Sequence, residues 1–426
     1  MATLFQPPAI LSNSNIYEVN IRQYTAEGTF NAFAKHLPRL KEMGVEIIWL
    51  MPIHPIGTVK RKGVLGSYYS IKDHEAINPE FGTATEFTAL VTAAHALEIK
   101  IILDWVANHA AWDHVWTRAD PLFFTRDAAG NFTPPFDWDD VIQFDHSNAA
   151  QQVAMKKAMK FWINTFDVDG FRADLAHLTP LQFWKDARTE LTPLKKDLIW
   201  LAETEEISYH EAFDISYTWE WMHATEKFIR KEISLQDCVN VLAKYKNAFP
   251  ENASRLFFTS NHDENSWNGT EYEKYGLYAK AMAVFSCTYP GIPLVYSGQE
   301  LPNRKRLQFF EKDKIDWEKE IALQEFYRKL LSLHKTSNAY RSGSVSISEN
   351  FIEKNIFAYT LAGEADVVAV ILNLGETTVK ETIVMEKLIG PFCDLFSGET
   401  AELKGQYEFS GEAGDYVVLE KYLPTE

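Results

Sequence analysis

Short apolar runs alternate with amphipathic segments along most of this chain. The runs are nearly continuous in large apolar residues, so they are predicted to be strands buried on both faces, as in a parallel sheet. Phe30, Phe33, Leu37 and Leu40 share one face of a helix that Gly44 would end. This alternation predicts an α/β fold, a parallel (β/α)8 or TIM barrel. The eight predicted strands lie at 15–24, 45–55, 100–109, 168–177, 197–203, 213–219, 255–263 and 292–300.

Two segments break the alternation. Residues 110–148 follow the third strand without a helical pattern, and a connection of that length is either functional or a small subdomain. From about residue 340 the pattern changes to short β runs with turn signals such as AGEA and FSGET, which predicts an antiparallel β-sandwich or sheet. We therefore expect a barrel formed by 1–109 and 149–339, an inserted domain at 110–148, and a C-terminal β domain at 340–426.

Charge and cysteine content restrict the partners and the compartment. The chain has 42 Lys and Arg against 59 Asp and Glu, a net charge of −17, which argues against nucleic acid and anionic membranes as partners. It contains no apolar run of about 18 residues that could span a membrane. The N-terminus shows no signal-peptide pattern. Cys238, Cys287 and Cys393 have no metal-ligand spacing, so free thiols in a reducing compartment are expected. We expect a cytoplasmic monomer, or an extracellular protein if a signal peptide has been removed.

Ionisable side chains follow the predicted ends of four strands. The carboxyl ends of barrel strands form the face on which barrel active sites lie. A single aspartate after a strand is usually a helix cap, but ionisable groups at four ends of one rim indicate an active site. The polar residues at the four strand ends are Asp104, Asn108 and His109; Arg172, Asp174 and His177; Glu203; and Asn261, His262 and Asp263.

Arg172 and Asp174 are two residues apart on one predicted strand, so their side chains point the same way. The guanidinium would lower the pKa of Asp174 and keep it ionised. Apolar neighbours and a nearby anion would raise the pKa of Glu203 on the next strand. An ionised and a protonated carboxyl group at roughly 5 Å from each other favour retaining glycoside hydrolysis. The alternative, a metal site of Asp and His ligands, needs an HxH pair on the first strand, where YEVNIRQY has no histidine.

Four short blocks occur in chain order: DWVANH at 104–109, GFRADLAH at 170–177, AE at 202–203 and SNHD at 260–263. Together they resemble the blocks that mark the α-amylase family, glycoside hydrolase family 13. The segment GSYYSIKDHEAINPEFGT at 66–83 resembles the loop after the second strand of that family. The resemblance covers roughly the first 340 residues, and it implies that the inserted segment is domain B and the C-terminal segment domain C.

The resemblance also implies roles for individual residues. Asp174 matches the nucleophile, Glu203 the general acid/base, and Asp263 the third carboxylate, which holds ring hydroxyls. Asp104 matches the aspartate that orders the site from beneath. The remaining matches are sugar-binding groups at the cleavage subsite: Tyr69, His109, Arg172 and His262.

Some positions depart from the family pattern, and others allow two interpretations of their role. His177 and Leu178 stand where many α-amylases carry a Lys-His pair on the leaving-group side, which makes His177 a candidate substrate contact. Asn108 helps to bind calcium in many relatives, and the acidic FDWDDV at 136–141 could supply further ligands, although calcium-free relatives keep the asparagine too. A structural Ca²⁺ therefore stays open, while the chemistry itself requires no metal. Trp267 either lines a leaving-group subsite or packs in the core.

The resemblance implies a retaining hydrolase that cleaves α-1,4-glucosidic bonds of starch-like glucans or maltooligosaccharides. An α-glucosidase or 4-α-glucanotransferase of the same family is the alternative, because subsites outside the motifs decide whether water or a sugar accepts the glycosyl group. A non-catalytic glucan-binding protein is a third hypothesis. Loss of Asp174 or Glu203 would mark that class, and both are present.

Overall fold

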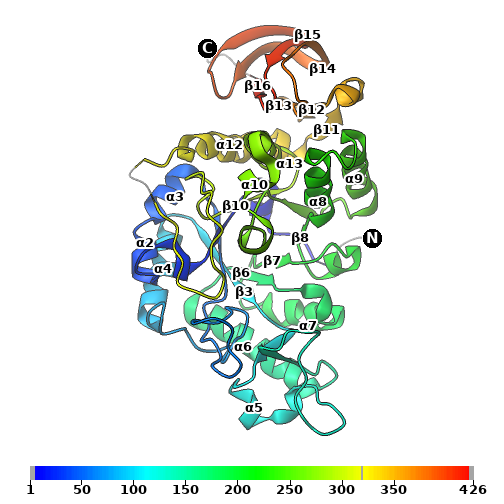
Figure 1. Cartoon of the computed structure of the whole chain (residues 1–426). Coiled ribbons are helices and arrows are strands. Elements are labelled where there is room, and N and C mark those ends of the chain that lie inside the picture. The colour runs from blue at the N-terminus through cyan, green and yellow to red at the C-terminus, as the bar shows by residue number, and fades with distance from the viewer. Residues whose placement is uncertain (1–4, 318–319, 422–426) are drawn as a thin grey trace.

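The computed structural model describes residues 5–317 and 320–421, so residues 1 and 426, the outer limits of the predicted domain ranges, lie outside the described part. Parallel strands close into a barrel with β10 returning to β1, which confirms the predicted fold class (Figure 1). The strands in barrel order are β1 Ile16–Val19, β2 Ile47–Leu50, β3 Lys100–Trp105, β6 Gly170–Ala173, β7 Ile199–Ala202, β8 Ile215–Tyr217, β9 Ser254–Phe257 and β10 Ile292–Tyr296.

Helices surround the barrel, and some of them begin at residues whose side chains cap them. The Thr83 side chain accepts the Glu86 N–H at the start of α4, and the Glu86 carboxylate accepts the Thr83 N–H in return, which is a capping box. Gly44 ends α3 in the left-handed conformation with φ of 96°. No helix among the described residues is long and apolar enough to cross a membrane. The longer helices are α3 Leu37–Met43, α4 Ala84–Ala96, α6 Ala149–Phe166, α7 Leu181–Leu191, α8 Trp219–Ile229, α9 Leu235–Ala248, α11 Ala279–Thr288 and α12 Gln324–Thr336.

The first predicted strand, 15–24, is too long. β1 ends at Val19, and Ile21–Tyr24 form the one-turn helix α1. The turn brings the fully buried Arg22 against Glu80 in the loop after β2, with Nε and Oε1 2.8 Å apart. This tertiary ion pair satisfies a charge that would otherwise be buried alone, and the local sequence pattern does not contain it.

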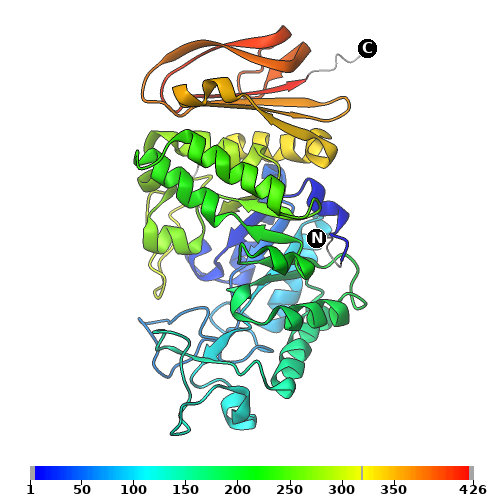
Figure 2. The same ribbon diagram turned by 90° about the vertical axis from the view of Figure 1, so that its right-hand side faces the viewer.

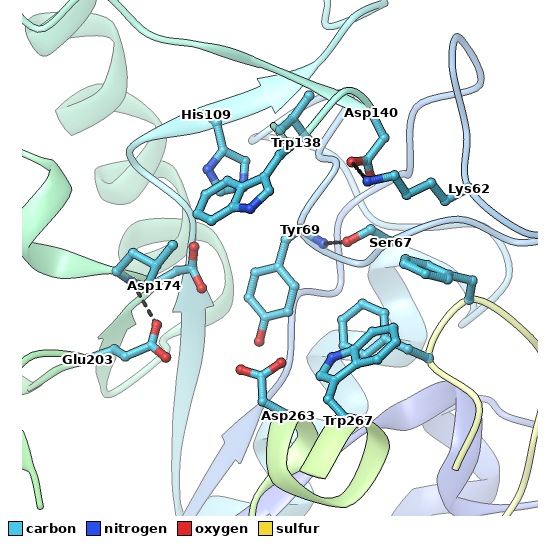
Figure 3. Close-up of a pocket in the computed structure, with 14 residues that line it drawn as sticks. Lys62, Ser67, Tyr69, His109, Trp138, Asp140, Asp174, Glu203, Asp263 and Trp267 are labelled. Atoms are coloured by element: carbon cyan, nitrogen blue, oxygen red, sulfur yellow. Dashed lines mark hydrogen bonds and ion pairs between the residues drawn. The ribbon is translucent and has the colours of Figure 1, made fainter. Parts of the chain in front are cut away.

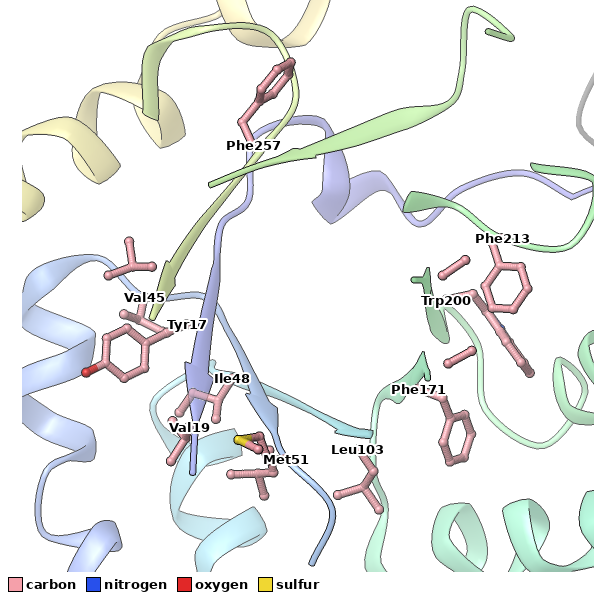
Figure 4. Packing of buried hydrophobic residues seen from close by; sticks show 14 of the residues in the cluster. Tyr17, Val19, Val45, Ile48, Met51, Leu103, Phe171, Trp200, Phe213 and Phe257 are labelled. Atoms are coloured by element: carbon pink, nitrogen blue, oxygen red, sulfur yellow. The ribbon is translucent and has the colours of Figure 1, made fainter. Parts of the chain in front are cut away.

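Apolar side chains alternate between two layers along the barrel strands. Ile16, Ile47 and Trp49 belong to a cluster that fills the barrel, whereas Tyr17 and Ile48 belong to the cluster between strands and helices. Figure 4 shows part of the second cluster. The two layers explain why each strand reads as a continuous apolar run.

The inserted segment forms a small domain B, drawn at the lower end of the molecule in Figures 1 and 2. Its two strands, β4 His109–Ala111 and β5 Val141–Gln143, pair antiparallel. Between them, Trp116–Ala119 form the short helix α5, which the sequence pattern did not predict. Phe124 and Phe144 stack with ring centroids 4.9 Å apart and give the domain an aromatic core.

The C-terminal segment forms one antiparallel sheet of six strands rather than two separate sheets. The long β14–β15 hairpin folds over β12 and β13, so that Ile383 and Phe409 share a buried core with Ile356 and Ile371. Figure 2 shows the resulting two layers above the barrel helices. In sheet order the strands are β11 Ser344–Ile347, β12 Ile356–Ala362, β13 Val367–Asn373, β16 Tyr416–Lys421, β14 Val379–Asp394 and β15 Thr400–Gly411.

Candidate active site

A cavity of about 300 Å³ lies at the carboxyl ends of the barrel strands, beside domain B (Figure 3). Five of the predicted site residues line it: Tyr69, His109, Asp174, Glu203 and Asp263. The remaining lining residues are Lys62, Ser67, Trp138, Asp140, Val141, Leu175, Trp267, Phe309 and Phe310. Asp104, Arg172 and His262 are buried and bonded to residues of this wall.

Arg172 lies beneath the cavity and contacts three carboxylates. One guanidinium nitrogen lies 2.9 Å from Asp104 Oδ1 and 3.0 Å from Asp174 Oδ1, and the other lies 2.9 Å from Glu203 Oε2. The guanidinium also lies over the Trp49 ring, 4.8 Å from its centroid. The sequence predicted the contact with Asp174 correctly, but the cation is shared because β3, β6 and β7 are neighbours in the barrel.

Asp174 and Glu203 each present one oxygen that these contacts leave available. Asp174 Oδ2 is buried and has no hydrogen-bond partner among the described residues. Glu203 Oε2 accepts the Leu175 N–H at 2.8 Å in addition to the Arg172 contact, which leaves Oε1 for a proton. At the opposite ends of these strands, a Cβ on Gly170 of β6 would lie only 2.0 Å from the Ile199 carbonyl oxygen of β7.

Burial raises the pKa of two carboxyl groups of the cavity, those of Asp174 and Glu203. Burial raises the pKa of Asp174 well above its ordinary value, with Arg172 opposing this shift and Glu203 and Asp104 adding to it. Burial likewise raises the pKa of Glu203, against the effect of Arg172. One guanidinium faces three carboxylates here, so its charge is shared among Asp104, Asp174 and Glu203. Arg172 lowers the pKa of Asp174, as the sequence predicted, but burial raises it by more.

His262 joins a second buried network beside the cavity. Its Nε2 lies 2.7 Å from the Tyr69 hydroxyl and 3.2 Å from Asp263 Oδ2, and its Nδ1 contacts Glu18. Burial lowers the pKa of His262, but Asp263 and Glu18 raise it by more. The pKa of His262 therefore lies well above its ordinary value. The resulting imidazolium lowers the pKa of Asp263, although burial alone would raise it. The Tyr69 hydroxyl donates to Asp104 Oδ2 at 3.0 Å and links both networks.

Sequence analysis missed some residues of the site. Glu18 is the carboxylate within the first predicted strand, and a charge in an otherwise apolar run was the available signal. Trp138 lines the cavity from domain B, 5.7 Å from His109 between ring centroids. Lys62 and Phe310 come from loops without periodicity, and nothing in their local sequence indicates a site.

Two candidate residues lie differently from what the sequence suggested. His177 is exposed on a turn at Ala176–Leu178 and does not belong to the cavity wall. Trp267 does line the cavity, half exposed, and packs against Phe309 with ring centroids 5.5 Å apart. In Figure 3, however, Trp267 lies on the side opposite to Glu203, which does not match a leaving-group subsite.

A structural Ca²⁺ at Asn108 stays a prediction, because the Asn108 side-chain oxygen has no partner among the described residues. Asn108 Oδ1 is buried without a partner among the described residues, and its amide nitrogen lies 3.3 Å from His109 Nδ1. The carboxylates of Asp139 and Asp140, which could have completed a site, pair with Lys62 Nζ at 3.1 and 3.0 Å. Within the described ranges, no group of three or more His, Cys, Asp or Glu side chains could hold a metal ion.

Comparison with known proteins gives similarity over the whole barrel. The model of the alpha amylase catalytic domain matches residues 8–141 and 127–344. The crystal structure of a noncanonic maltogenic alpha-amylase, AmyB from Thermotoga neapolitana, superimposes with a TM-score of 0.89 at 30% identity, covering 97% of this chain and 100% of that one.

Two curated relatives are longer than this chain. The alpha-amylase MalA of Haloarcula japonica is 27% identical over 433 residues, which cover 96% of this chain and 61% of that protein. An alpha-1,4-glucan:maltose-1-phosphate maltosyltransferase of Picrophilus torridus is 26% identical over 426 residues, with 90% of this chain and 65% of the relative covered. The chain therefore spans less than two thirds of the length of either relative.

Proposed function

The chain belongs to the α-amylase family, since the catalytic-domain model of that family matches most of it, and from this we propose that it is a retaining α-glucan hydrolase. The observation that carries the proposal is the placement of Asp174 and Glu203 on one cavity wall, with Arg172 in contact with both. The proposed substrates are starch-like glucans or maltooligosaccharides linked by α-1,4 bonds. This substrate class is supported by the similarity of nearly the whole chain to the alpha-amylases from Thermotoga neapolitana and Haloarcula japonica.

In the proposed reaction, Asp174 Oδ2 attacks the anomeric carbon while Glu203 Oε1 delivers its proton to the glycosidic oxygen. The C–O bond to the leaving sugar breaks, and a glycosyl ester on Asp174 forms. Glu203, now a carboxylate, removes a proton from water, which attacks the anomeric carbon and releases Asp174. Asp263 and His262 bind ring hydroxyls, and the Tyr69 ring packs against the sugar.

The contacts of Asp174 and Glu203 fit these roles. Attack needs an unengaged lone pair, and Asp174 Oδ2 accepts no hydrogen bond from the described residues. In the transition state, positive charge develops at the anomeric carbon. This charge favours an ionised Asp174 and leaves the proton on Glu203. The two carboxyl groups thus supply the nucleophile and the acid from one site.

Transfer to a sugar acceptor is a second candidate, favoured by the similarity to the maltosyltransferase of Picrophilus torridus. The two activities share the glycosyl ester and differ in what accepts it. We further propose that the protein acts as a monomer in the cytoplasm. The three free cysteines support a reducing compartment.

The proposed reaction is tested by trapping its intermediate. Exposed to α-glucosyl fluoride, a Glu203→Gln variant should accumulate a glucosyl group on the peptide that contains Asp174, because fluoride leaves without acid help while breakdown lacks a base. Mass spectrometry of peptides after rapid acid quenching locates the label. The matched control is the Asp174→Asn, Glu203→Gln double variant, which should stay unlabelled. A label on another carboxylate would overturn the assignment of the nucleophile.

A further inference from the structure

The direction in which a substrate crosses the cavity follows from the position of Glu203. An acid that protonates the leaving oxygen must lie beside the leaving group, so the part of the substrate that becomes bound to Asp174 extends the other way. In Figure 3, Glu203 and Lys62 lie on opposite sides of the cavity, with Tyr69 between them. The side at Lys62 therefore receives the non-reducing part of the glucan, if the proposed function holds.

The loop at 57–66 on that side is attached to domain B at several points. The Thr58 N–H and hydroxyl donate to Asp113, the hydroxyl at 2.8 Å. Lys60 Nζ lies 3.4 Å from the centroid of the Trp112 ring, within cation–π distance. Lys62 Nζ adds the ion pairs with Asp139 and Asp140 described above.

The same loop is attached to the segment that follows β10. The Leu65 N–H donates to the Phe310 carbonyl oxygen at 3.0 Å, and the Val64 N–H donates to Glu311 Oε1 at 3.0 Å. A Cβ on Gly63 would lie 2.5 Å from the Phe310 Cβ, so the two segments are in direct contact. The loop thus forms a continuous bridge from domain B to the segment after β10.

We propose that this bridge, residues 57–66, closes the non-reducing end of the cavity, so that the enzyme removes short units from chain ends instead of cutting within chains. Lys62, Phe309 and Phe310 all belong to the cavity wall, which places the bridge against the substrate space. The volume of about 300 Å³ is at the lower end of the ~300–1,000 Å³ usual for ligand pockets. A long glucan on that side would have to pass through the bridge. Lys62 is then a specificity-determining residue.

The energetics suggest how to open the bridge. The Lys62 side chain is 38% exposed, so its ion pairs contribute little individually, and the loop is held by the sum of its contacts. A Lys62→Ala, Glu311→Ala double variant removes a side-chain contact on either side of the loop. A second variant replaces residues 60–65 with two glycines and shortens the bridge itself.

The test compares two reducing-end-labelled maltoheptaosides, one free and one blocked with an ethylidene group at its non-reducing end. Wild type should cleave the blocked substrate about tenfold or more slowly than the free one, because a blocked end does not fit a closed subsite. Both bridge variants should raise the blocked-to-free rate ratio about tenfold and release longer fragments. Lys354→Ala, which removes an ion pair with Glu381 in domain C, is the matched control and should keep the wild-type ratio.

The readouts separate this inference from the proposed function. Turnover of α-glucosyl fluoride needs only the cleavage subsite, so it reports an intact, folded active site in every variant. Equal rates of wild type on blocked and free substrate would overturn the closed end and leave the hydrolase intact. So would bridge variants that process the fluoride but keep the wild-type ratio. Absence of turnover of every α-glucoside by wild type would instead overturn the proposed function, and the closed end with it.

Discussion

Arg172 shows how one residue organises the site through several partners. It is fully buried, and its charge is balanced by Asp104, Asp174 and Glu203, each at 2.9 or 3.0 Å. A planar guanidinium can donate in several directions at once, whereas an ammonium is a single point charge. The position therefore requires arginine for its shape as much as for its charge.

At the residue scale, we expect Arg172→Lys to lower kcat about a hundredfold, because the carboxyl groups lose their common donor and shift from the reactive geometry. The measurement is kcat on a maltooligosaccharide, together with the melting temperature. Arg188→Lys is a matched control, since Arg188 is also buried, pairs with Asp214 at 2.6 Å and lies outside the cavity wall. It should lose stability with kcat retained. Equal kcat losses in both variants would show that Arg172 acts through folding alone.

Asp169, directly before β6, connects several elements. It accepts the Ile101 N–H of β3 at 2.8 Å, and its carboxylate contacts His95 of α4 and Lys195 before β7 at 2.7 and 2.9 Å. Burial would raise the pKa of Asp169, but the hydrogen bonds from His95 and Ile101 and the charge of Lys195 lower it to about 2. The ionised carboxylate thus holds β6, which carries Arg172, against its neighbours.

At the element scale, we expect Asp169→Asn to lower the free energy of unfolding by about 2–3 kcal/mol at pH 7. A lowered pKa stabilises the fold above the unfolded value of about 3.9, and this stabilisation is lost as the pH falls toward about 2. The difference between wild type and variant in urea unfolding should therefore shrink as the pH falls below about 4. Asp186→Asn, which changes the side chain that accepts from Gln182 on α7, is the control. A difference that stays constant with pH would contradict the role of the charge.

Domain C is joined to the barrel by an aromatic interface. Phe357 of β12 lies near Phe285 of α11 and Trp221 of α8, with ring centroids 5.7 and 6.3 Å away. The hydroxyls of Tyr359 and Thr288 lie 2.7 Å apart at the same contact. Because these side chains are buried, the two domains share part of their apolar core.

At the scale of the whole molecule, we expect Phe357→Ala to lower the free energy of unfolding by about 3–5 kcal/mol, with a single transition and kcat unchanged. Differential scanning calorimetry gives the number of transitions. Val384→Ala, at a position of domain C that is 54% exposed, should leave stability nearly unaltered. An early separate transition of domain C in the Phe357 variant would show that the domains unfold independently.

Sequence by itself determined the barrel and the chemical groups on its rim. The apolar runs predicted each barrel strand, and Gly44 and Thr83 cap helices as local chemistry requires. The RxD spacing correctly predicted that Arg172 contacts Asp174. Such features depend on neighbours within a few residues, where backbone periodicity decides which side chains share a face.

Only the tertiary structure decided which charged side chains contact each other and which loops reach the cavity. Arg172 reaches Glu203 because β6 and β7 are adjacent, and Glu18 contacts His262 although 244 residues separate them. Lys62 joins domain B through Asp139 and Asp140, while His177 lies outside the cavity wall. Strand register, barrel closure and loop packing fix these contacts. They are set by the burial of the whole chain, and no local pattern encodes them.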